Sequence, residues 1–394
     1  MMTAFELLRR IIASEVMGED SLSGIENELD ENLIGELYGV AKAFDMAHLC
    51  GSALKKLKPS VPENILAPFY NEFAVSVFRN RRLTDELSQI SELFENEGID
   101  HIALKGAVIR PLYPEAWMRT SCDIDVLVKK EQLDSARTAL EQKLGYKYLT
   151  ECSHDISFES VTGVHLELHF YLLEDYNSLS LQSDTIGDIW DKVTAAEGKR
   201  HTMLMSDADL YFYNLAHMAK HFLSGGCGVK PFIDLWVLEN RVDYDLATRE
   251  KLVADGGLAP FLEASRQLMR VWFFGAEYTE EDRLFEKYIL QGGIYGTVEN
   301  KVRVGLAKKR GRFYYLLSRI FPSYKAMKNM YPSLEKYKIF LPFYHIRRWC
   351  RILFCGGIKR ASFQISKSST LDKSEINDTD LLLKSLGFAV EKQQ

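Results

Sequence analysis

The sequence predicts an α+β fold, a small mixed β-sheet with helical N-terminal and C-terminal portions. Three observations support this prediction. Apolar residues recur at helical spacing over residues 1–98 and 184–360, short strands alternate with helices over 99–144, and three further strand-length apolar runs follow over 146–170. Strands that cluster after a strand–helix alternation are typical of a sheet with helices on one side.

The N-terminal portion, residues 1–98, is predicted to be entirely helical. It begins with an amphipathic helix over 3–17, regains helical periodicity over 33–57, and ends with a long helix over 64–97. Gly98 follows, and glycine readily adopts the left-handed conformation that caps a helix. No residue of this portion carries an evident chemical signal.

The predicted sheet lies within residues 99–183. Its expected elements, in order, are a strand over 99–104, a turn at Lys105-Gly106, a helix over 107–113, a strand over 123–128, a helix over 131–144, and strands over 146–149, 156–160 and 164–170. Downstream we expect a helical domain from about Asp184 to residue 300 that lines a cleft, a basic aromatic helical segment over 301–360, and a flexible tail over 361–394 with one short helix at 381–386.

Charge is unevenly distributed along the chain. The net charge is −6, yet residues 301–360 hold sixteen Lys or Arg residues and one acid, Glu335, with aromatic residues interleaved. This composition is typical of a segment that binds nucleic acid, an anionic membrane surface, or the acidic remainder of its own chain. The three interpretations stay open.

The cysteines and the apolar runs indicate a cytoplasmic protein. Six cysteines are scattered without a Cys-x-x-Cys pair, and no secretory apolar region opens the chain. The longest apolar runs are far shorter than a membrane span. We therefore expect a reduced, cytoplasmic chain with no transmembrane segment.

Asp123 and Asp125 form the central chemical motif. On the strand predicted over 123–128, side chains two residues apart leave the same face, whereas Ile124 and Val126 point to the core. Two like charges on a strand that is otherwise buried require a cation between them. Oxygen ligands in this arrangement suit Mg²⁺ bound with nucleotide phosphates.

A third acid and a glycine turn favour the metal interpretation over a solvated strand face, the commoner meaning of an isolated Asp-x-Asp. Glu167 alternates with apolar residues, so on a neighbouring strand it would share the face of the two aspartates and complete a two-metal site. Gly106 lies at a strand-to-helix turn, where the backbone can approach a phosphate. Arg119 is expected either to neutralise phosphate charge or to pair with a carboxylate.

These residues resemble a known family. Leu104-Lys-Gly-Ala107, Arg119 and Asp123-Ile-Asp-Val-Leu-Val128 look like the signature of a bacterial family of uncharacterised nucleotidyltransferases within the DNA polymerase beta-like superfamily. The likeness covers roughly residues 70–355. It implies a metal site of Asp123, Asp125 and Glu167 for one or two Mg²⁺ ions, and nucleotide binding by Lys105, Gly106, Ala107 and Arg119.

One departure concerns the phosphate turn. The superfamily usually has a serine after the turn glycine, where its hydroxyl touches phosphate, and this chain has Ala107. Lys105 is a candidate replacement that supplies a charge in place of the hydroxyl. A lysine that simply faces solvent is the alternative interpretation.

Two histidines belong to a part that resembles the helical half of the family. His217 and His221 are four residues apart on a predicted helix, so they share one face. A hydrolytic zinc site is the weakest interpretation, because Met218 stands where a zinc protease has its general-base glutamate. The alternatives are residues that line the cleft, with His169, Lys230 and Asp234, or ordinary packed histidines.

The resemblance implies a reaction. We expect an Mg²⁺-dependent transfer of a nucleoside monophosphate from an NTP to an unknown hydroxyl acceptor (a small molecule, sugar, peptide or protein), with release of pyrophosphate. The alternative is a catalytically inactive nucleotide-binding module of a regulatory or antitoxin-like kind. Contact with an anionic surface through residues 301–360 is the other partner that we consider.

Overall fold

The computed structural model describes residues 2–25, 28–152, 154–172, 185–242, 245–294, 296–309, 312–354 and 358–388. The chain divides into two compact units. Unit 1 comprises Met1–Met218 and Val229–Tyr278, and unit 2 comprises Ala219–Gly228 and Thr279–Gln394. The predicted sheet and the motif around Asp125 lie in unit 1.

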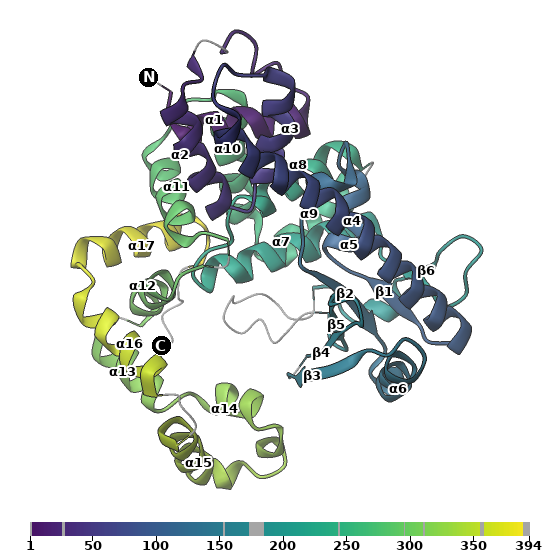
Figure 1. The fold of residues 1–394 in the computed structure, drawn as a ribbon. Helices are drawn as coiled ribbons and strands as arrows, with labels where there is room; N and C mark the ends of the chain where they lie inside the picture. The colour runs from purple at the N-terminus through teal and green to yellow at the C-terminus, as the bar shows by residue number, and fades with distance from the viewer. Residues whose placement is uncertain are drawn as a thin grey trace. The chain divides into compact units, whose positions relative to one another are not determined.

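Unit 1 contains a five-stranded sheet in the order β1-β2-β5-β4-β3 (Figure 1). Its strands are β1 (His101–Ala103), β2 (Asp123–Val128), β3 (Lys147–Glu151), β4 (Asp155–Glu159) and β5 (His165–His169). Strands β2 and β5 pair in parallel, and the other neighbours are antiparallel. The prediction of a small mixed sheet in an α+β fold is confirmed.

One face of this sheet builds the core. Ile124, Val126 and Val128 point to that face and are buried together with side chains of α4 (Glu63–Glu97) and α6 (Leu133–Lys143). Because side chains alternate along a strand, the acidic residues of β2 leave the opposite face. The core packing thus fixes which face is free for chemistry.

Helices precede the sheet, as predicted for the N-terminal portion. They are α1 (Ala4–Ile12) with a π-helical turn at Ala13–Met17, α2 (Glu31–Ala43), α3 (Ala47–Leu57) and α4. Leu7, Leu8 and Ile11 of α1 are fully buried, which confirms the amphipathic pattern. Gly98 ends α4 in the left-handed conformation (φ 71°).

The region after the sheet is only partly as predicted. The helical pattern expected from about Asp184, a residue outside the described ranges, is wrong over residues 189–204. That stretch forms a short 3₁₀ helix and a two-stranded sheet of β6 (Thr194–Ala195) and β7 (Met203–Leu204). The backbone N–H of His101 donates to the carbonyl of His201 (2.9 Å), so partners distant in sequence hold this stretch extended. The helices that follow, α7 (Asp207–Leu223), α8 (Lys230–Arg241), α9 (Leu246–Asp255) and α10 (Ala259–Phe274), agree with the prediction.

Unit 2 is helical in its described residues. Beyond the end of α7 it contains α11 (Glu280–Gly292), α12 (Val298–Lys308), α13 (Arg312–Ile320), α14 (Tyr324–Met330), α15 (Leu341–Phe354), α16 (Ile358–Thr370) and α17 (Lys373–Ser385). The tail predicted over 361–394, flexible with one short helix at 381–386, is therefore wrong over residues 361–388, and residues 389–394 lie outside the described ranges. Leu371 packs in one apolar cluster with Val302 of α12, and Arg303 pairs with Glu375 (3.0 Å), so tertiary contacts support these helices.

Within the described part of the chain, every helix is too short or too polar to cross a bilayer.

Candidate active site on the free face of the sheet

The parallel pairing of β2 and β5 brings the predicted acids together. Asp125 lies directly opposite Glu167 in the register, and Asp123 lies opposite His165. Residues that face each other across two strands project to the same side of the sheet. Two carboxylates more than forty positions apart in sequence thus become neighbours, with the rest of β2 and β5 buried beneath them.

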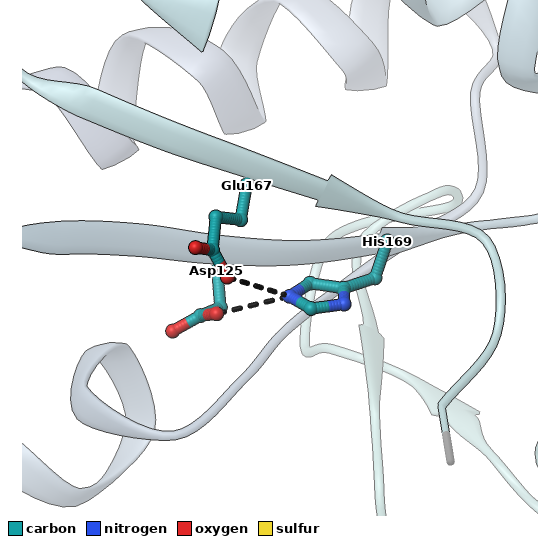
Figure 2. Close-up of side chains that lie close together, drawn as sticks. All are labelled: Asp125, Glu167 and His169. Carbon is teal, nitrogen blue, oxygen red and sulfur yellow. Dashed lines mark hydrogen bonds and ion pairs between the residues drawn. The ribbon is translucent and has the colours of Figure 1, made fainter. Parts of the chain in front are cut away.

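His169 joins the two carboxylates (Figure 2). Its Nε2 atom lies 2.9 Å from Oδ1 of Asp125 and 3.5 Å from Oε2 of Glu167. One ligand atom from each of the three residues lies within 4.8 Å of the others. His169 stands two residues after Glu167 on the same strand, so strand periodicity predicts its direction, although from the sequence we expected it only to line a cleft.

Lys105 supplies a positive charge to the same carboxylate. Its Nζ atom lies 2.6 Å from Oδ1 of Asp125, the oxygen that His169 also contacts. The Asp125 side chain is 5% exposed and that of Lys105 is 17% exposed, so the pair is largely shielded from water. Lys105 is therefore not a lysine that simply faces solvent. Its ammonium supplies the positive charge beside Asp125.

The two aspartates have opposite pKa shifts. Burial raises the pKa of Asp125, but Lys105 and His169 outweigh burial and hold it well below its usual range. Burial raises the pKa of Asp123, and the nearby charges of Asp125 and Glu167 raise it further. Asp125 is therefore firmly ionised. The negative charge of Asp123 is disfavoured by the neighbouring carboxylates of Asp125 and Glu167.

The pKa values of two neighbouring basic groups, Lys105 and His169, are also shifted. Burial would lower the pKa of Lys105, but the attraction of Asp125 dominates and raises it. Burial likewise opposes the charged form of His169, while its hydrogen bonds to Asp125 and Glu167 raise its pKa overall. Both groups thus stabilise negative charge on the free face of the sheet.

A divalent cation fits this donor set. Asp125 and Glu167 offer carboxylate oxygens, and His169 offers one imidazole nitrogen. Carboxylates are the ligands of Mg²⁺ and Mn²⁺, and a nitrogen ligand moves the preference toward Mn²⁺ and later transition metals. Asp123 projects from the same face and is influenced electrostatically by Asp125 and Glu167, so it stands as a candidate fourth ligand.

The predicted phosphate turn has an unusual backbone. Lys105 adopts φ 46° and ψ −119°, a conformation that residues with a Cβ rarely take. The N–H of Ala107 donates to the carbonyl of Leu104 (3.1 Å), so this donor is already used within the turn. The strained residue is also the one whose ammonium reaches Asp125.

Arg119 pairs with a carboxylate, the second of its two predicted roles. Its Nε and Nη2 atoms donate to the two oxygens of Asp234 at 2.8 Å each, and the Tyr113 hydroxyl donates to the same carboxylate at 2.6 Å. Both charged side chains are 10% exposed. This buried network ties helix α8 to the segment that precedes β2.

The remaining predicted residues lie on α7 and α8. Lys230 donates to Asp45 (2.8 Å) and to the carbonyl of Thr120 (2.9 Å), so it also anchors α8 beside β2. His217 and His221 are half-buried on α7, and the ring of His217 lies 6.1 Å from that of Tyr213. Asp125, Glu167 and His169 are the one group of three or more metal-ligand side chains found together in the described ranges, and neither α7 histidine belongs to it.

Two residues of this region were not singled out from the sequence. Arg110 is 5% exposed, and its Nη2 atom donates to the Ser121 hydroxyl (3.2 Å). A Cβ placed on Gly106 would lie 3.4 Å from each of these two groups and would overlap the guanidinium of Arg119. The glycine is therefore required for close packing against two cations, which no local pattern in the sequence reveals.

Comparison with known proteins identifies the class. No curated protein and no solved structure matches the chain. A family model described as uncharacterised nucleotidyltransferase matches residues 30–274, which is more than half of the chain and includes β1 to β5 and the site. This agrees with the resemblance seen in the motifs around Lys105 and Asp125. The chain belongs to the uncharacterised nucleotidyltransferase family and is a transferase of nucleotidyl groups.

Proposed function

We propose that the chain transfers a nucleoside monophosphate from an NTP to a hydroxyl acceptor, with Mg²⁺ or Mn²⁺ bound at Asp125, Glu167 and His169 and with Asp123 as a further ligand. The observation that carries the proposal is the convergence of these ligand atoms within 4.8 Å on the free face of the sheet, inside the segment matched by the family. The bound ion would neutralise charge on the triphosphate and on the leaving pyrophosphate.

The chain's own groups have separate tasks in this proposal. The acceptor oxygen forms a bond to the α-phosphorus while the bond from that phosphorus to the β-phosphate bridging oxygen breaks, and pyrophosphate leaves. Glu167, whose side chain is 30% exposed, is the accessible carboxylate that takes the acceptor proton. Asp125 stays ionised because the ammonium of Lys105, 2.6 Å away, stabilises its charge. The buried residues therefore hold charge, and the more exposed one moves a proton.

Asp125→Asn and Glu167→Gln test this proposal. Pyrophosphate release from ATP, GTP, CTP and UTP, measured with Mg²⁺ or Mn²⁺ and a cell extract as acceptor source, should fall by about 100-fold or more in both variants because charge stabilisation is lost. Matched controls are Asp134→Asn and Glu151→Gln, two exposed acids of the same unit. Equal turnover in the site variants and the controls would refute the proposal. Nucleotide binding without pyrophosphate release in the wild type would favour a non-catalytic nucleotide-binding module.

A further inference from the structure

Arg110 is a buried cation without a matching anion. Its side chain is 5% exposed, and its Nε atom is buried with no hydrogen-bond partner among the described residues. No carboxylate of the described ranges lies within ion-pair distance of its guanidinium. Among the described residues, its hydrogen-bond partner is the hydroxyl of Ser121, a neutral group. A buried charge without a counter-charge destabilises a fold, so the position calls for another explanation.

The surroundings of Arg110 oppose its charge. Burial and the nearby Arg119 lower the pKa of Arg110 to about 10, while Asp123 and Asp125 act in the other direction. Arg119 itself is compensated by Asp234, but Arg110 has no such partner. The unbalanced positive charge of the region therefore resides on Arg110, close enough to the aspartates to feel their field.

Because Gly106 has no side chain, the guanidinium of Arg110 lies close to the backbone of the turn. A Cβ at Gly106 would lie 3.4 Å from Nη2 of Arg110, so the missing side chain leaves the backbone of the turn directly beside the guanidinium. Ser121 accepts from Arg110 and donates to the carbonyl of Asp123 (3.2 Å), which fixes the guanidinium relative to the first residue of β2. Arginine presents donors in a planar fork that suits phosphate oxygens.

We propose that Arg110 binds the phosphates of the nucleotide and that Ser121 positions it. The inference rests on the proposed function and deepens it, because it assigns the phosphate contact that Ala107, having no hydroxyl, does not make. The ligand class is a polyphosphate ester. Its negative charge would balance Arg110 on one side while a divalent cation balances the carboxylates on the other.

Arg110→Met separates a binding role from a structural one. If the guanidinium serves the fold, the substitution lowers the melting temperature of the ligand-free protein. If it serves phosphate binding, the ligand-free melting temperature stays equal or rises, because an unpaired buried charge is replaced by an apolar side chain of similar length. The affinity for inorganic tripolyphosphate, measured by calorimetry, should fall by about 10- to 100-fold, the value of a charge-assisted contact.

Two further variants sharpen the test. Arg110→Lys keeps the charge without the fork and should regain part of the tripolyphosphate affinity, and Ser121→Ala should raise KM for the NTP with a smaller change in kcat. Arg81→Gln, at an exposed arginine of α4, is the control. Unchanged tripolyphosphate affinity in Arg110→Met would overturn the inference. Wild-type protein that binds tripolyphosphate through Arg110 but shows no turnover would instead refute the proposed function and leave this inference intact.

A second, independent observation concerns α15 in unit 2. Phe343, Ile346, Leu353 and Phe354 are 60%, 54%, 57% and 84% exposed, and their spacing of three, seven and one residues places them on one side of the helix. The other side is engaged, because Arg348 and Trp349 donate to carbonyls at the end of α13 at distances of 3.0 Å. Helix α15 is thus held against α13, while its apolar stripe stays exposed to solvent.

The charge around the stripe indicates its partner. Arg347 and Arg351 are exposed and lie beside it on the helix, and residues 301–360 contain sixteen bases against one acid. An amphipathic helix with aromatic and aliphatic residues next to arginines is typical of binding in the plane of a membrane interface. We infer that this face of α15 docks on an anionic lipid bilayer, with Phe343, Ile346, Leu353 and Phe354 inserted among the acyl chains.

Vesicle co-sedimentation of the full chain tests this inference. The protein should bind phosphatidylcholine vesicles that contain 30 mol% phosphatidylglycerol, bind pure phosphatidylcholine far less, and dissociate as salt rises. Leu353→Ser with Phe354→Ser should weaken binding at least tenfold, since two large apolar side chains no longer leave water for the acyl chains. Val161→Ser, at a 76% exposed apolar residue of unit 1, is the control. Salt-insensitive or absent binding would overturn the inference, as would a wild-type dimer that the double variant converts to a monomer.

Discussion

The ammonium of Lys105 and the carboxylate of Asp125 form a largely buried ion pair of 2.6 Å on the functional face of the sheet. Lys105 reaches this position from a backbone conformation that is unfavourable for any residue with a Cβ. Such strain is tolerated where the surrounding structure holds it in place. The pair therefore couples the shape of the turn to the charge state of Asp125, which we propose as a metal ligand.

Lys105→Met is expected to destabilise the metal-free protein by about 3–5 kcal/mol, since it leaves a buried carboxylate with one partner fewer. Chemical denaturation in the presence of a chelator measures this change. Lys129→Met is the control, because Lys129 makes an equally short ion pair with Asp100 that is more exposed, and its loss should cost roughly 1 kcal/mol or less.

The same variant changes the response to metal. Without the lysine, Asp125 is free of its internal cation, so Mn²⁺ should raise the melting temperature more in Lys105→Met than in the wild type. Thermal unfolding at increasing Mn²⁺ concentration gives the comparison. A smaller metal-dependent rise in the variant would show that Lys105 assists the ion and does not compete with it.

The pair of Arg119 and Asp234 is expected to stabilise the fold. Arg119→Met or Asp234→Asn alone should cost about 3–5 kcal/mol, because each leaves one member of a 10% exposed pair uncompensated. The double variant Arg119→Met, Asp234→Asn should lose less than the sum of the two single losses, and denaturant titrations of all four proteins give the coupling energy. A raised KM for the NTP without loss of stability in Arg119→Met would instead support the phosphate-binding role considered from the sequence.

The sequence predicted β2 correctly, because the signal for this strand lies in the alternation of adjacent residues. Alternation over Asp123–Val128 identifies the strand, the buried face and the face of the acids, and Glu167 follows by the same parity. It did not show which distant groups meet that face. Lys105 and Asp234 find their partners across 20 and 115 positions, and only the packing of the turn and of α8 decides those pairings.

Short or weakly patterned elements escaped prediction for a related reason. β6 and β7 have two residues each, too few for any periodicity, and their position depends on contacts with the edge of β1. Helices α16 and α17 have a polar composition that suggested a flexible tail. Burial of Leu371, Leu382 and Leu383 supports them, and three apolar positions among many polar ones are a weak signal.

His169→Ala should weaken Mn²⁺ binding more than Mg²⁺ binding. The substitution removes the one nitrogen donor of the ligand group and leaves its oxygens, which Mg²⁺ prefers. A loss of about tenfold or more for Mn²⁺ is expected in calorimetry. His165→Ala is a matched control on the same strand, since its Nε2 atom lies 3.9 Å from Glu167 and its side chain is 38% exposed. Equal effects of the two substitutions on both ions would contradict a ligand role for His169.

Protein stability should fall below pH 6.5 through His48, a residue remote from the metal ligands. Its ring is 3% exposed, and its Nε2–H donates to the carbonyl of Met118 (2.7 Å). Burial lowers the pKa of His48 to about 4 from an ordinary value of 6.5. Because the folded state binds the proton less readily than the unfolded chain, stability from this group is complete above pH 6.5 and declines as the pH falls toward 4.

The decline amounts to roughly 3 kcal/mol over that window if the whole shift is realised. His48→Gln keeps a donor for the Met118 carbonyl but does not titrate, so its free energy of unfolding should vary less between pH 4 and 6.5. Urea titrations of both proteins at matched pH values isolate the contribution of His48, because the other acidic groups titrate equally in each. Parallel pH dependences for the two proteins would mean that the ring is already charged in the folded state or reaches water.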